Sequence, residues 1–171
     1  TLLHSEELTH DLIKEIKADI ISKGDKAIKA LTKKFDNVQL DDIQVSPSEI
    51  KSAYKCVTQD YLIALKEAHT NITEFHTHQK PKSWQKSPRE GVRYGMRFSA
   101  IQKVGLYVPG GKAVYPSSVL MNAIPACIAG VEEMVMVTPP QPDGSIPAHV
   151  LVAADLCGVT TIYKVGGAQA I

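Results

Sequence analysis

Cysteine is scarce in this 171-residue chain, and no CxxC motif is present, so neither a zinc knuckle nor a dithiol redox pair is offered. The three cysteines, Cys56, Cys127 and Cys157, are odd in number and widely separated, which argues against a disulfide framework. Each lies in apolar sequence. We therefore expect reduced, buried thiols with a structural role, in a cytoplasmic protein.

Long apolar runs and excess charge are also missing. No run approaches the roughly 20 residues that a membrane-spanning helix needs. The first residues, TLLHSEELTHDL, lack a basic flank followed by an apolar stretch, so a signal peptide is not predicted. The 19 basic and 18 acidic residues leave a net charge of +1, which gives no electrostatic reason to expect nucleic acid or an anionic membrane as a partner.

Charge is unevenly distributed along the chain. Hydrophobic residues make up 44% of it, enough for a real core, yet only seven of the 37 charged residues (19 + 18) follow position 100. The first part is therefore expected to form solvated helices and the last part a buried α/β layer. We predict two units, residues 1–104 (helices plus a hairpin) and residues 105–171 (a partial Rossmann-like domain).

The first unit carries helix signals. Leucine and isoleucine recur at helical spacing, and SPSE at residues 46–49 combines an N-cap serine, a first-turn proline and a capping-box glutamate. The lysine-rich segment that ends at Lys86 is interpreted as a solvated linker. The alternating residues 91–108, GVRYGMRFSAIQKVGLYV, predict one or two strands, which could form a hairpin.

The second unit alternates strand and helix. VGLYV, EEMVMVTPP and VTTIYKV predict strands, and SSVLMNAIPACIAG and IPAHVLVAADLCG predict the helices between them, the first capped by Ser117 or Ser118. Short connections favour right-handed crossovers and a parallel sheet. The fold class is thus α/β, with a helical region and a short β hairpin followed by an incomplete Rossmann-like βαβαβ sheet.

Glycine pairs follow two of these strands. The strands end in VPGG, TPP and VGG, which places all three ends on the edge where open α/β sheets bind ligands. Glycine there lets the backbone approach a nucleotide closely, and a helix N-terminus offers unpaired N–H groups. The alternative is that the glycines serve only tight turns. A P-loop is excluded, because Leu106 and Ala113 stand where it needs Gly and Ser or Thr.

Other polar residues are interpreted as structural. His76 and His78 are two positions apart on a helix and point to different sides, so they are not expected to share a metal ion. His149 is expected on the polar face of its helix. Lys112 and Lys164 are expected to be surface charges. No catalytic group and no metal ligand is assigned to this chain.

Five motifs together resemble histidinol dehydrogenase: KGDKAIKALTKKFD, NITEFHTHQK, VGLYVPGG, SSVLMNAIPACIAG and KVGGAQAI. Members of that family oxidise L-histidinol to L-histidine through histidinal, in two NAD-dependent steps of histidine biosynthesis. They use one zinc ion and form intertwined homodimers. The resemblance implies the same substrate, cofactors and assembly for the protein that contains this chain.

The resemblance also implies NAD contacts. The tyrosine before VPGG matches Tyr107, and the glutamine of GGAQA matches Gln169, while Pro109, Gly110 and Gly111 would line the same edge. Tyr107 would stack on or hydrogen-bond the cofactor, and Gln169 would bind its ribose or phosphates. The alternatives are an aromatic side chain that packs on the sheet, and a helix cap or solvent contact.

The family's zinc ligands and its Glu-His proton-transfer pair all come later than residue 171, so we expect a segment that neither turns over histidinol nor binds zinc by itself. A three-stranded parallel sheet with one face uncovered is a second reason for this expectation. Two alternatives stay open: a non-catalytic relative that has lost the zinc site, and an interaction module without a small-molecule role.

Overall fold

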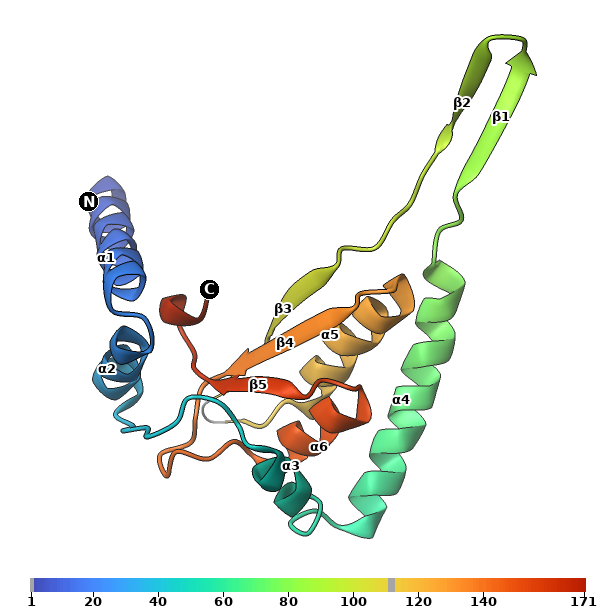
Figure 1. Cartoon of the computed structure of the whole chain (residues 1–171). Coiled ribbons are helices and arrows are strands. Elements are labelled where there is room, and N and C mark those ends of the chain that lie inside the picture. Colours follow the sequence, from blue (N-terminus) through green and yellow to red (C-terminus); the bar gives the residue numbers. More distant parts are fainter. Residues whose placement is uncertain (1, 111–112) are drawn as a thin grey trace.

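The computed structural model describes residues 2–110 and 113–171. Four helices come first, a protruding hairpin follows, and a three-stranded parallel sheet with its crossover helices completes the chain (Figure 1). This arrangement confirms the predicted α/β fold class. Among the described residues, no helix combines the length and the apolar character that crossing a bilayer requires.

The helical region begins and ends where local sequence chemistry places it. Ser46 accepts a hydrogen bond from the Glu49 backbone N–H while the Glu49 side chain accepts one from the Ser46 backbone, which confirms the capping box. Thr58 caps the next helix by accepting a hydrogen bond from the Tyr61 N–H. The four helices are α1 (Leu2–Lys23), α2 (Asp25–Asp36), α3 (Pro47–Ala53) and α4 (Gln59–Gln79).

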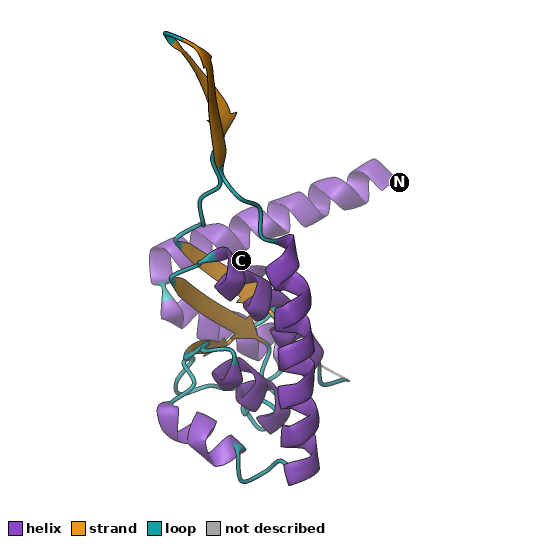
Figure 2. Ribbon diagram, turned by 90° about the vertical axis from the view of Figure 1, so that its right-hand side faces the viewer, coloured by secondary structure: helices purple, strands orange, loops and turns teal. Residues whose placement is uncertain are grey.

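An antiparallel hairpin projects from the end of α4 (Figures 1 and 2). Its strands are β1 (Trp84–Arg89) and β2 (Val92–Met96), and Gly91, with φ 74°, lies in the turn between them. The predicted hairpin lay within residues 91–108, which was wrong, because β2 pairs with the segment before it. The interpretation of that segment as a linker fails at its end, where residues 84–86 belong to β1.

The parallel sheet has the order β3-β4-β5, so its strands lie side by side in the order of the sequence. Tyr107 is in register with Val137, and Val137 with Tyr163. The elements are β3 (Lys103–Tyr107), α5 (Pro116–Ala129), β4 (Glu133–Thr138), α6 (Ala148–Leu156), β5 (Thr161–Lys164) and the 3₁₀ turn η1 (Ala168–Ala170).

Helices α5 and α6 cover one face of the sheet (Figure 1). On that face Leu106, Met136 and Ile162, one from each strand, are buried in the hydrophobic core with the apolar sides of both helices. Side chains alternate along a strand, so Tyr107 and Tyr163 lie on the opposite face, where they are more exposed. The sheet is therefore fully buried on one face only.

The helical region contributes to the same core. Val45, Ile50, Ala53 and Leu65 pack with the residues of α5, α6 and the sheet. The segment before α3 also runs along the edge of β5. There the Val45 N–H donates to the Ile162 carbonyl (2.9 Å) and the Lys164 N–H donates to the Ile43 carbonyl (2.7 Å). One edge of the sheet is thus closed by a segment from the first half, and the boundary at residue 104 stays a prediction.

Two local predictions were wrong. Tyr115, not a serine, occupies the N-cap of α5, because Pro116 fills the first helical position with a φ already suited to a helix. Of the three free cysteines only Cys157 is buried, whereas Cys56 and Cys127 are exposed. Burial, and to a smaller extent the neighbouring Cys127, raises the pKa of Cys157 to about 12. Apolar neighbours in sequence did not reveal that Cys56 lies in an exposed bend after α3 or that Cys127 takes the exposed side of α5.

Candidate site at the carboxyl edge of the parallel sheet

The three strands end on one edge of the sheet, and the turns that follow them meet there. Pairing extends one residue past β3, where the Val108 N–H donates to the Val137 carbonyl (2.9 Å). Pro109 and Gly110 then leave β3, Pro139 leaves β4, and Gly166 and Gly167 follow β5. These turns, residues 108–110, 139–140 and 165–167, are called the carboxyl edge below.

Pro139 fills the space beside both glycine turns. A Cβ added to Gly110 would lie 2.6 Å from the Pro139 Cγ, and one added to Gly166 would lie 2.6 Å from the Pro139 Cβ. Both distances are too short for any side chain. The space beside these two glycines is therefore filled by a proline of the protein and is not open to a ligand. This agrees with the alternative that the glycines serve tight turns.

Tyr107 joins the first and last turns. Its phenolic oxygen accepts a hydrogen bond from the backbone N–H of Gly167 at 3.0 Å, and its side chain is 38% exposed. The bond crosses the end of the central strand β4, because β3 and β5 are not neighbours. A tyrosine predicted from the first turn is thus in direct contact with the turn that leads to Gln169.

Gln169 is buried, with 6% of its surface exposed. Its side chain turns back over Gly167, where a Cβ would lie 2.7 Å from the Gln169 Oε1. Gln169 belongs to η1, the short turn that ends the chain. The structure therefore brings Tyr107, Gly167 and Gln169 together at one place on the carboxyl edge.

Two cavities open at this edge, one on each side of β4. The first, about 380 Å³, is lined by Pro109, Gly110, Pro139 and Thr138 and reaches the starts of α5 and α6. The second, about 450 Å³, contains Gln169 and lies on the sheet face opposite α5 and α6. Hence Pro109 and Gly110 do not share a cavity with Gln169. Gly111 and Lys112, which were assigned to the site and to the surface, lie outside the described residues.

A carboxylate that sequence reasoning missed borders the first cavity. The Asp36 Oδ2 is buried and makes no hydrogen bond to another described residue. Burial raises the pKa of Asp36 above its ordinary value. Its position as the last residue of α2 gave no signal, because aspartate at a helix end reads as solvated.

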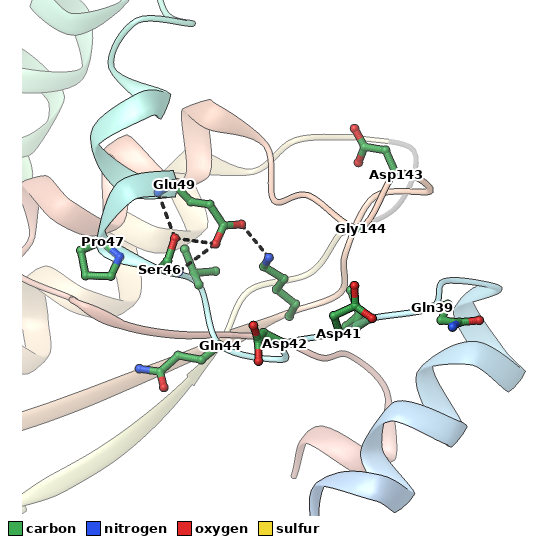
Figure 3. Close-up of a pocket in the computed structure, with 12 residues that line it drawn as sticks. Gln39, Asp41, Asp42, Gln44, Ser46, Pro47, Glu49, Asp143 and Gly144 are labelled. Carbon is green, nitrogen blue, oxygen red and sulfur yellow. Dashed lines mark hydrogen bonds and ion pairs between the residues drawn. The ribbon is translucent and has the colours of Figure 1, made fainter.

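A polar pocket of about 630 Å³ lies on the side of β5, between the first half and the sheet (Figure 3). Lys164, the last residue of β5, is 9% exposed, and its ammonium pairs with Glu49 Oε1 at 2.6 Å. The interpretation of Lys164 as a surface charge was wrong. The other Glu49 oxygen stays in the capping box of Ser46 (Figure 3).

The pKa of Glu49 reflects these contacts. Partial burial acts to raise it, but the hydrogen bonds from Lys164 and Ser46 outweigh burial, so the pKa lies below its usual range. One carboxylate thus fixes the start of α3 and the end of β5 together. Because Lys164 is already paired, the described residues that line this pocket offer no free cation to an anionic ligand.

The described residues contain no group of three or more His, Cys, Asp or Glu side chains that could hold a metal ion. His76 hydrogen-bonds Gln79 (2.7 Å between the Nδ1 and Oε1 atoms). His149 packs edge-on against Tyr61, with ring centroids 4.6 Å apart, and is partly exposed. No histidine of this set is placed at the carboxyl edge.

The fold is that of an α/β protein whose parallel strands end together at one edge, which is the edge where open α/β sheets bind ligands. A sequence profile of the histidinol dehydrogenase family matches residues 3–171. The chain belongs to the histidinol dehydrogenase family.

Individual relatives agree with this assignment. Histidinol dehydrogenase of Halalkalibacterium halodurans is 48% identical over 96% of this chain and 39% of its own length. That of Clostridium acetobutylicum is 49% identical over 94% and 38%. A crystal structure of the Elizabethkingia anophelis enzyme superposes with a TM-score of 0.90 at 38% identity, over 94% of this chain and 37% of that one. The chain spans about two fifths of the length of the curated relatives it matches.

Proposed function

We propose that this chain forms the cofactor-positioning part of an NAD- and zinc-dependent dehydrogenase that oxidises L-histidinol to L-histidine, and that the intact protein is a homodimer. The proposal is supported by relatives that carry the name histidinol dehydrogenase. It is carried by one observation, the hydrogen bond that joins Tyr107 to Gly167 beside Gln169 at the carboxyl edge.

The described residues suit a dinucleotide. NAD supplies the hydride acceptor when it is bound. The half-exposed ring of Tyr107 offers a surface for stacking, and its hydroxyl group offers a donor and an acceptor. The Gly167 N–H is held in place by Tyr107 and could donate to a ligand oxygen instead. Gln169 adds an amide with both donor and acceptor atoms.

The described residues do not suit zinc as they suit a dinucleotide. No set of three candidate ligands exists among residues 2–110 and 113–171, so the residues present do not fit a zinc site. We propose that zinc is held by parts of the protein outside this chain.

Titration of NAD⁺ into the intact gene product tests the cofactor proposal. Tyr107→Ala removes the stacking surface and the acceptor of the Gly167 N–H. It should raise the Kd for NAD⁺ by about 5-fold to 150-fold, since aromatic stacking on a base contributes about 1–3 kcal/mol. Tyr94→Ala, on the hairpin, is the control and should leave the Kd unchanged. Equal affinities in the wild-type and Tyr107→Ala proteins would overturn the proposal.

Turnover separates this proposal from a non-catalytic relative. The intact protein should reduce NAD⁺ when it is given L-histidinol, and sedimentation should show two copies per particle. NAD⁺ binding without turnover would identify the non-catalytic relative.

A further inference from the structure

Pro139 lies against the glycine turns on both sides of the central strand. The glycine after β3 faces mainly the outer part of the ring: a Cβ on Gly110 would lie 2.6 Å from Pro139 Cγ, 3.2 Å from Cδ and 3.2 Å from the Pro139 carbonyl oxygen. The glycine after β5 faces mainly the inner part: a Cβ on Gly166 would lie 2.6 Å from Pro139 Cβ, 3.1 Å from its Cγ and 3.2 Å from its Cα. Two different parts of one proline thus set the approach of two turns.

Conformational freedom does not explain these glycines. Neither Gly110 nor Gly166 has a positive φ, whereas Gly167 does, with φ 65°. An alanine could adopt the backbone conformation at positions 110 and 166. The contact with Pro139 excludes a Cβ at both positions, so the glycines and the proline are matched in shape.

Gly110, Pro139 and Gly166 belong to a ring of contacts that begins and ends at Tyr107. Tyr107 precedes the Pro109–Gly110 turn, Pro139 separates this turn from Gly166, and the Gly167 N–H returns to Tyr107 through its 3.0 Å hydrogen bond. Pro139 is at the centre because β4 is the middle strand. Its width therefore sets how far Tyr107 stands from the turn that carries Gln169.

We propose that Pro139 is a positioning residue for the dinucleotide: wedged between Gly110 and Gly166, it sets the spacing at which Tyr107 and Gln169 meet one ligand. This inference rests on the proposed function of the carboxyl edge. Pro139 acts through the two turns, and no contact of its own with the ligand is required. Misplacement of a positioning group by about 1 Å can lower a rate by about 100-fold, and we expect the affinity for the dinucleotide to fall with it.

A pair of double-mutant cycles tests the positioning role of Pro139 in the intact protein, with the Kd for NAD⁺ as the readout. Alone, Gly110→Ala and Gly166→Ala should each raise the Kd by about 10- to 100-fold. Pro139→Ala removes Cγ and Cδ but keeps Cβ. In that background Gly110→Ala should raise the Kd by less than about threefold, while Gly166→Ala should still raise it by about tenfold or more.

Gly105→Ala is the matched control, because a Cβ there meets no atom within 4 Å among the described residues, and its Kd should equal that of the wild type. The thermal midpoint of each variant is measured beside the Kd. If Gly166→Ala does not fold, the Gly110 cycle decides alone.

Three results would overturn the positioning role of Pro139. The first is a Gly110→Ala effect on the Kd that is the same with and without Pro139→Ala, and the second is a normal Kd for Gly166→Ala once Pro139→Ala is added. The third is that the glycine variants lower the thermal midpoint without changing the Kd. The proposed function fails separately, if Tyr107→Ala binds NAD⁺ as the wild type does. A weakened Tyr107→Ala together with unchanged glycine variants would reject Pro139 alone.

Discussion

On one face of the parallel sheet, Met136 and Ile162 are completely buried beneath α5 and α6, whereas on the other face Tyr107 is 38% exposed at the carboxyl edge. The same strands carry both sets, because neighbouring residues point to opposite sides. The covered face holds the core of the fold. The other face ends in the turns where Tyr107, Gly167 and Gln169 meet. Substitutions on the two faces should therefore differ in what they change.

Substitutions at two neighbouring residues of β4 should give the largest difference in the free energy of unfolding between the two faces. Met136→Ala should lower the free energy of unfolding by about 2–5 kcal/mol, because the side chain is fully buried on the covered face and leaves a cavity. Val135→Ala, on the opposite face of the same strand, should cost less than half as much. Urea unfolding measures both. Equal losses would show that the two faces are packed alike.

The ion pair beside the sheet should have a smaller effect. Glu49→Gln removes the partner of the nearly buried Lys164 ammonium and should cost about 1–3 kcal/mol at pH 7. Asp42→Asn, in the same pocket but without an ion pair to a described residue, should cost far less.

The Glu49 contribution also depends on pH with a definite sign. The pKa of Glu49 is lowered in the folded protein, so the stabilisation is complete above the unfolded value near 4.5 and is lost as the pH falls through the lower, folded value. The stability difference between wild type and Glu49→Gln should therefore shrink in acid below about pH 4.5. A difference that stays constant down to pH 3 would contradict this account.

A hydrogen bond that ties α3 to α6 should contribute less. The Tyr54 hydroxyl donates to Asp155 Oδ2 at 2.6 Å, and burial together with Asp155 raises the pKa of Tyr54 to about 12. Tyr54→Phe should cost about 0.5–1 kcal/mol. Because the pKa is raised, the contribution is complete below the unfolded value near 10, so the cost should be constant between pH 6 and pH 9. A cost that changes within that range would reject the assignment.

The smallest effect is expected on the projecting hairpin. Trp84 is 49% exposed and makes an edge-on contact with Tyr94, at 6.1 Å between ring centroids. Trp84→Ala should change the free energy of unfolding of this chain by no more than about 0.5 kcal/mol. A loss of 2 kcal/mol or more would mean that the hairpin belongs to the cooperative core.

Sequence reasoning located the βαβαβ sheet because buried strands and small-residue helices alternate with short connections. It missed the partner of β2, because β1 contains charged residues and Pro88 and has no apolar alternation. It identified Glu49 as a capping residue but not its pairing with Lys164, which depends on the path of the chain along β5. Local chemistry was readable, whereas contacts between distant segments were not.

At the carboxyl edge, too, local features could be predicted from the sequence and contacts between distant segments could not. The order of strands and turns predicted that the turns after β3 and β5 share one edge, and the resemblance to histidinol dehydrogenase indicated Tyr107 and Gln169 there. The structure has both beside Gly167. The role of Pro139 was not readable, because TPP after a strand signals only a turn. Its contacts with Gly110 and Gly166 depend on β4 being the central strand. Their use in binding NAD stays a prediction.

A crystal structure of the intact protein with NAD⁺ tests the central proposal most directly. We expect the dinucleotide at the carboxyl edge, in contact with both the Tyr107 ring and the Gln169 amide, with Pro139 still seated between Gly110 and Gly166. A dinucleotide bound elsewhere, with Tyr107 and Gln169 left untouched, would contradict it.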